Sequence, residues 1–139
     1  MEDITISIVA YNDEVDVRKA VESIERCTSP LVRKKIYLID NSTKDNTIYK
    51  LGKEYEDVEY RKLGENVGFG RGHNSVINEL NSKYHAIVNP DVLVKEDSFS
   101  ILMDFCRKTD CGMVVHVLRM LRAIFWMCTG ESLLYLICS

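Results

Sequence analysis

Short apolar segments alternate with helical segments along residues 1–111, and this alternation constrains the fold more than any other feature of the sequence. The apolar runs predict strands at residues 4–10, 35–40, 58–63 and 84–89. Apolar positions with helical spacing predict a helix after each strand, at residues 14–26, 47–54, 73–81 and 98–108. A strand joined to the next through a helix builds a parallel sheet. We therefore expect an α/β fold, with a mostly parallel sheet and helices on both faces.

Charge is distributed unevenly along the 139 residues. Residues 112–139 carry only three charged side chains, Arg119, Arg122 and Glu131, out of 39 in the whole chain. We therefore divide the chain into an α/β domain at residues 1–111 and an apolar tail at residues 112–139.

The apolar tail has two interpretations. A last strand at residues 112–118 is followed by a frameshifted or aberrant C-terminus, or else Val114–Cys128 associates with a membrane. A spanning helix needs about 20 mostly apolar residues, which Arg119 and Arg122 interrupt. A sheet that lacks later strands exposes apolar edges, so we also expect self-association unless the tail covers them.

Composition excludes several classes of protein. A net charge of -3 argues against nucleic acid as a partner. The five cysteines include no CxxC pair, which argues against a disulfide framework or a zinc knuckle and favours a reducing cytoplasm. Glu2 and Asp3 open the chain where a secretory signal would be basic, so we expect no export by that route.

Polar residues follow each predicted strand, where an α/β sheet binds its ligands. Asp40 ends the second strand, and its carboxylate could accept hydrogen bonds from a base or a ribose, or could instead stabilise the following turn. Asn89-Pro90-Asp91 ends the fourth strand and suits a divalent cation, although a plain turn explains it too. His73, His85 and His116 have no metal-ligand spacing and are interpreted as structural or surface residues.

The segment 64–74 holds glycines at positions 64, 68, 70 and 72 before a predicted helix. Glycines permit close approach of the backbone to a ligand, and Arg71 adds a cation, so the segment suits a diphosphate or its sugar. The spacing matches neither the dinucleotide-binding nor the Walker A pattern, and a flexible turn is the alternative.

Four ordered segments together resemble family 2 glycosyltransferases, particularly the rhamnosyltransferase-like members. They are residues 6–12 (ISIVAYN), 39–45 (IDNSTKD), 66–74 (NVGFGRGHN) and 88–92 (VNPDV). The resemblance implies a GT-A, Rossmann-like fold that binds a nucleotide sugar. It implies donor contacts at Tyr11, Asn12, Asp40, Asn66, Gly68, Gly70, Arg71, Asn74 and Asn89. Asp91 matches the last acid of the family's Asp-x-Asp motif, the ligand of Mg²⁺ or Mn²⁺, and Asn89 replaces the first acid.

The resemblance also implies a reaction. A sugar, with rhamnose as one candidate, would pass from a dTDP or UDP donor to a saccharide or lipid-linked acceptor. No acid of this chain matches the family's general base, so we expect the donor-binding half without the acceptor half. The alternative is a non-catalytic module that binds nucleotide sugars.

Overall fold

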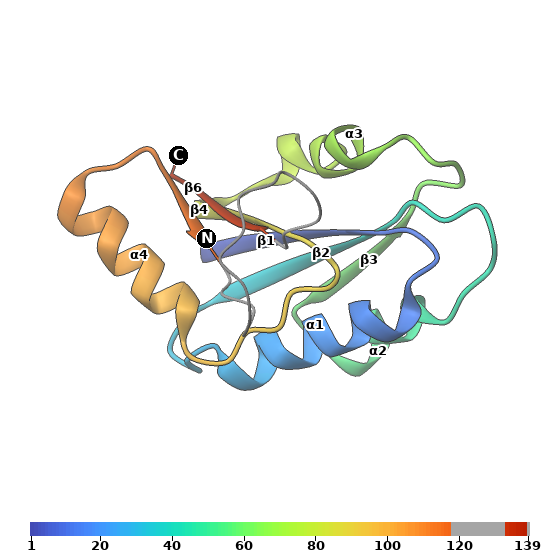
Figure 1. Ribbon diagram of the computed structural model, residues 1–139, viewed down its shortest axis with the longest axis horizontal. Helices are drawn as coiled ribbons and strands as arrows, with labels where there is room; N and C mark the ends of the chain where they lie inside the picture. The colour runs from blue at the N-terminus through green and yellow to red at the C-terminus, as the bar shows by residue number, and fades with distance from the viewer. Residues whose placement is uncertain (118–132, 139) are drawn as a thin grey trace, which may run out of the picture.

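The computed structural model describes residues 1–117 and 133–138, which contain a sheet in the order β3-β2-β1-β4-β6-β5 (Figure 1). The strands are β1 (Glu2–Ala10), β2 (Lys34–Asp40), β3 (Val58–Lys62), β4 (Ser82–Val88), β5 (Met113–Val117) and β6 (Leu133–Cys138). Strands β1 to β4 pair in parallel, whereas β6 runs antiparallel to both β4 and β5. The expected mostly parallel sheet is confirmed.

Helices cover both faces of the sheet, as expected (Figure 1). On one side lie α1 (Glu14–Cys27) and α2 (Leu51–Glu54), and α3 (Phe69–Asn74) lies on the other. The helix α4 (Ser98–Thr109) follows β4 and contributes Phe99 and Leu102 to the same core as α1.

Strand β1 is the centre of this arrangement because both of its faces are covered. Every residue from Ile4 to Ala10 is buried. Ile4, Ile6 and Ile8 belong to the larger core with α1 and α4, while Val9 belongs to a smaller core under the segment that contains α3. Apart from Ser7, residues Ile4–Ala10 are apolar or β-branched, as is typical of a strand buried on both faces, which is why this strand was predictable.

The helix predicted at residues 73–81 is wrong. Helix α3 starts four residues earlier, at Phe69, and is followed by a 3₁₀ turn, η2 (Ile77–Glu79). Glycines disfavour a helix in isolation, but here the lack of a side chain at Gly72 lets the helix pack directly on Val9 of β1. Tertiary packing therefore overrides local propensity. The helix predicted at residues 47–54 is likewise divided, into a 3₁₀ turn, η1 (Ile48–Lys50), and α2.

The tail contributes two strands to the sheet. The strand predicted at residues 112–118 is β5, and β6, which was not predicted, lies between β4 and β5. Arg119, Arg122 and Glu131, with most of the segment considered for membrane association, lie outside the described residues. Within the described part of the chain, no helix is long and apolar enough to cross a membrane.

Candidate functional site

A cleft of about 780 Å³ opens where the carboxyl ends of β1, β2 and β4 meet. This volume is in the range of small-molecule sites. Each of the four sequence segments that resemble the family contributes to its lining. The predicted site residues that line it are Tyr11, Asn66, Gly68, Asn89 and Asp91. Segments separated by up to eighty residues in sequence are thus brought to one edge of the sheet.

Two asparagines connect the walls of the cleft. The side-chain amide of Asn41, directly after β2, donates to Asn66 Oδ1 at 2.7 Å. Asn41 Oδ1 accepts from the Val67 amide at 2.9 Å, and Asn66 Oδ1 also accepts from the Gly68 amide at 3.0 Å. Gly68 has a φ of 84°, a conformation that residues with a side chain rarely adopt. These hydrogen bonds hold the start of the glycine-rich segment against the end of β2.

The turn after β1 presents Tyr11 to solvent. The Asn12 amide donates to the Ser42 hydroxyl at 2.8 Å, and Asn12 has a φ of 54°, a left-handed conformation that asparagine tolerates. This turn leaves the Tyr11 ring 49% exposed at the mouth of the cleft. Asn12 itself does not line the cleft; its left-handed backbone conformation shapes the turn.

Asp40 is fully buried below the cleft and does not line it. Its carboxylate accepts from the Ser42 amide at 2.9 Å, from the Asn46 side chain at 2.8 Å and from the Tyr60 hydroxyl at 2.7 Å. Burial raises the pKa of Asp40, but hydrogen bonds from Tyr60, Asn46 and Ser42 outweigh burial and lower the pKa overall. These contacts are those of the turn-stabilising alternative. A direct contact to a base stays a prediction.

Three other predicted donor contacts, Gly70, Arg71 and Asn74, lie on α3 outside the lining of the cleft. Gly70 and Arg71 are exposed on this helix. The structure therefore brings half of the predicted site residues together, and the rest lie below the cleft, in the β1 turn or along α3.

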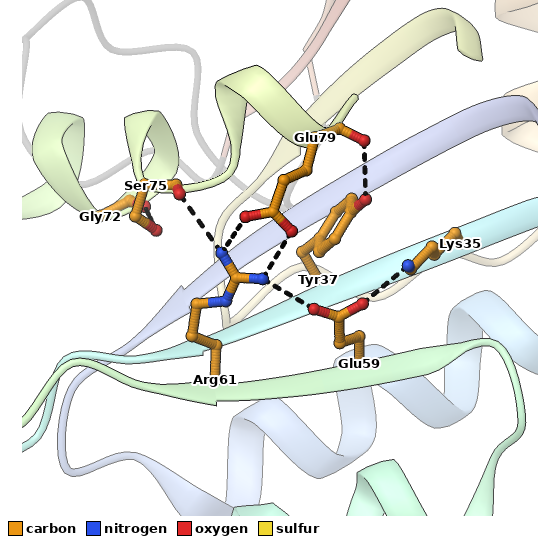
Figure 2. Close-up of polar contacts among 7 residues, drawn as sticks. All are labelled: Lys35, Tyr37, Glu59, Arg61, Gly72, Ser75 and Glu79. Atoms are coloured by element: carbon orange, nitrogen blue, oxygen red, sulfur yellow. Dashed lines mark hydrogen bonds and ion pairs between the residues drawn. The ribbon is translucent and has the colours of Figure 1, made fainter. Parts of the chain in front are cut away.

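An ionic network holds η2, the turn that follows α3, on β3, as Figure 2 shows. The Arg61 guanidinium contacts both carboxylate oxygens of Glu79, at 2.6 and 2.7 Å, and Glu59 at 2.8 Å. Lys35 pairs with the other oxygen of Glu59 at 2.7 Å. The Tyr37 hydroxyl donates to the Glu79 carbonyl at 3.2 Å. The fork geometry of arginine thus fastens η2, the turn that follows α3, to the sheet.

The cleft is acidic. Its lining contains the carboxylates of Asp13, Asp16 and Asp91 and includes no lysine or arginine among the described residues. Asp16 pairs with Lys19 at 3.2 Å. A diphosphate entering this cleft would meet negative charge, so a bound cation would have to compensate it.

Sequence reasoning did not select several lining residues as ligand contacts: Val9, Asp13, Asp16, Asn41, Phe69 and Pro90. Asp13 stands at the N-cap of α1 and Asp16 lies in its first turn, where acidic residues are ordinary helix-start chemistry. The side chain of Asp13 makes no capping hydrogen bond in the structure, although the residue stands at the N-cap of α1. The position of Asn41 directly after a strand was the signal that could have identified it.

Polar side chains connected by hydrogen bonds lie on the face of β1 that α3 covers. Ser7 Oγ lies 2.7 Å from His73 Nδ1 and 3.0 Å from His85 Nε2, and His85 Nδ1 lies 2.9 Å from Thr5 Oγ1. Burial lowers the pKa of both histidines to about 4. Both histidines are therefore neutral at physiological pH, and the interpretation of His73 and His85 as structural fits these contacts.

Comparison with known proteins places this fold in a class. The fold resembles that of S. aureus TarS residues 1–349, with a TM-score of 0.70 and 16% identity, covering 81% of this chain and 34% of that one. It also resembles the mannosyltransferase PcManGT from Pyrobaculum calidifontis, solved in complex with GDP-Man and Mn²⁺. That match has a TM-score of 0.75 and 16% identity, and it covers 85% of this chain and 36% of that one. A further TarS structure, in complex with UDP-GlcNAc, matches with a TM-score of 0.70 and 14% identity over 81% of this chain and 33% of that one. The chain thus spans about a third of the length of these structures.

The fold is that of a GT-A glycosyltransferase. The sequence matches Glycosyl transferase family 2 over residues 5–121, and the chain belongs to this family. No curated protein matches the sequence.

Proposed function

We propose that the cleft binds a nucleoside diphosphate sugar and supplies the donor side of a sugar transfer. One observation carries this proposal: all four family-like segments line a single cleft at the carboxyl edge of the sheet. The donor we propose is a dTDP- or UDP-sugar, with rhamnose as the first sugar to test. The acceptor we propose is a saccharide or a lipid-linked saccharide.

Different residues of the cleft lining can contact different parts of the donor. The exposed ring of Tyr11 can stack on the base. Asn66 and the backbone at Gly68 also line the cleft and can approach the ribose and the diphosphate. Asp91 and Asn89 provide oxygen ligands at the end of β4.

A divalent cation, Mg²⁺ or Mn²⁺, fits this cleft. No group of three or more His, Cys, Asp or Glu side chains able to hold a metal exists among the described residues. Mg²⁺, however, is commonly held by one or two carboxylates together with substrate phosphates, which Asp91 and a diphosphate would supply. When bound, the cation stabilises negative charge on the departing nucleoside diphosphate. Because the described residues of the lining include no lysine or arginine, we expect nucleotide binding to depend strongly on the cation.

Calorimetric titration of the full chain with UDP-GlcNAc, a dTDP-sugar and GDP-mannose, each with and without Mn²⁺, tests the proposal. We expect binding of at least one UDP or dTDP donor only with Mn²⁺, and Asp91→Asn to weaken it by at least about tenfold. Glu56→Gln is the matched control, because Glu56 is exposed and precedes β3 at the opposite edge of the sheet. Absence of binding at millimolar nucleotide with Mn²⁺ would refute the proposal. Tighter binding of GDP-mannose than of the UDP or dTDP donors would support the proposed site but identify a different donor.

Association with a membrane and self-association stay predictions that depend on residues 112–139. Comparing the full chain with a chain ending at residue 111 by size exclusion and by vesicle flotation would test both. A monomeric full chain that does not float would contradict them.

A further inference from the structure

Two cysteines lie side by side at the end of α4, away from the residues that line the cleft. Cys106 is in the last turns of α4, and Cys111 follows the helix just before β5. Their sulfur atoms are 3.3 Å apart. Asp110 has a left-handed conformation, with φ 52° and ψ 37°, and it reverses the chain so that Cys111 returns to the helix.

The two thiols differ in access. Cys106 is buried, with 3% of its surface exposed, whereas Cys111 is partly exposed. Hydrogen bonding by Thr109 and then by Cys106 lowers the pKa of the Cys111 thiol. A partly exposed thiol with a lowered pKa is the one that reacts first with an oxidant, and a buried neighbour can then displace the product.

We propose that Cys106 and Cys111 are a reversible oxidation site that forms an intrachain disulfide by exchange with a low-molecular-weight disulfide such as oxidised glutathione. The Cys111 thiolate attacks one glutathione sulfur, the S–S bond of glutathione breaks, and one glutathione leaves as a thiolate that takes up a proton. Cys106 then loses its proton, attacks Cys111 Sγ in the mixed disulfide, and releases the second glutathione. Two protein thiols are oxidised and one glutathione disulfide is reduced to two thiols.

The geometry permits the second step without rearrangement of the fold. A disulfide bond is about 2.05 Å long, so the two sulfur atoms must approach by about 1.3 Å, which side-chain rotation can supply. The second attack occurs within the protein, so the burial of Cys106 does not prevent it. The bond would tie the end of α4 to the residue two positions before β5. In a reducing compartment such a bond is transient, which fits a regulated modification rather than a structural cross-link.

Peptide mapping of the full chain tests the proposal, because trypsin cleaves after Arg107 and Lys108, between the two cysteines. The reduced protein is incubated with oxidised glutathione at pH 8, alkylated and digested without reductant. We expect peptide 96–107 linked to peptide 109–119 with the loss of two hydrogen atoms. We expect this product to form about tenfold faster than the glutathione adduct at Cys27, the internal reference. Dithiothreitol should restore the separate peptides.

Two variants separate the steps. With Cys106→Ser, Cys111 should retain glutathione, because the displacing thiol is absent. Cys27→Ser should leave the linked product unchanged. A stable glutathione adduct at Cys111 in the unmodified chain, or modification of Cys27 as fast as the pair, would overturn the proposal. A link from Cys111 to Cys138 would also overturn it, since the pairing of Met113 with Ile137 brings β6 close to this turn. These outcomes are read from the unmodified chain and do not depend on the variants folding.

Discussion

Replacing Gly72 by alanine should destabilise the protein because it pushes α3 away from β1. A Cβ atom at this position would lie 2.9 and 3.0 Å from the two methyl groups of Val9 and 3.5 Å from Val9 Cβ. Rotation of Val9 cannot relieve both methyl contacts, since valine is stiff about its first side-chain torsion. Overpacking of this kind costs about 1–3 kcal/mol.

Gly70→Ala is the matched control for this prediction. It lies on the same helix, and an added Cβ would meet nothing within 4 Å. Both substitutions gain about the same helix propensity, up to about 1 kcal/mol, so the propensity cancels in their difference. We therefore expect Gly72→Ala to be about 1–3 kcal/mol less stable than Gly70→Ala.

Urea unfolding followed by circular dichroism measures this difference directly. The two variants should have equal m-values, and Gly72→Ala should have the lower midpoint concentration. Equal midpoints would mean that α3 does not pack on Val9 as closely as the structure shows. The reasoning about the glycine-rich segment would then be refuted.

Three further substitutions test other contacts. Tyr60→Phe removes the 2.7 Å hydrogen bond to Asp40 and should cost about 1.5–3 kcal/mol at pH 7 in urea unfolding. The cost should shrink as the pH falls below the ordinary range of an aspartate, because the stability that the lowered pKa of Asp40 contributes is fully present above its unfolded-state pKa and is lost as the pH falls through its folded-state pKa. His73→Asn should reduce the acid sensitivity of the fold between pH 6.5 and 4. Because the folded-state pKa of His73 is about 4, the free energy of unfolding falls as the pH falls through this window, by up to about 1.4 kcal/mol per pH unit for one histidine. An unchanged slope would contradict the assignment of His73 as buried and neutral. Arg61→Lys should weaken nucleotide binding because it loses the forked contact with Glu79, which holds η2 and the helix α3 before it on the sheet. Arg33→Lys breaks a similar contact with Asp3 at the opposite edge of the sheet and should leave binding unchanged. Equal binding by both variants would show that Arg61 does not position α3.

The strands of residues 1–111 were predictable because their burial leaves a direct signal in the sequence. Apolar and β-branched residues predominate in Ile4–Ala10 and Lys35–Asp40, so the strands they predict agree with β1 and β2 within two residues. Strand β6 gave no usable signal, because the tail is mostly apolar without a clear period, and a strand in it cannot be told from a helix. The start of α3 was missed because glycines disfavour a helix in isolation, and this helix depends on its contact with β1.

The edge of the sheet that carries the site was predictable, but the side chains that form its surface were only partly so. Tyr11, Asn66 and Asp91 line the cleft because they directly follow strands or belong to the glycine-rich segment. Asp40 also follows a strand, yet Ser42, Asn46 and Tyr60 use its carboxylate within the protein. The Tyr60 contact comes from a neighbouring strand, and a single sequence contains no record of such a long-range partner.

The most direct measurement of the central claim is an NMR titration of the isotopically labelled full chain with a UDP- or dTDP-sugar, first in Mg²⁺ and then in Mn²⁺. The account predicts that the amide signals of Tyr11, Asn41, Asn66 and Asn89 shift together with the nucleotide. Paramagnetic Mn²⁺ should then broaden signals most strongly around Asp91, while residues at the opposite edge, such as Lys34 and Glu56, stay unchanged. Shifts confined to that opposite edge, or no shifts at millimolar nucleotide, would contradict the account.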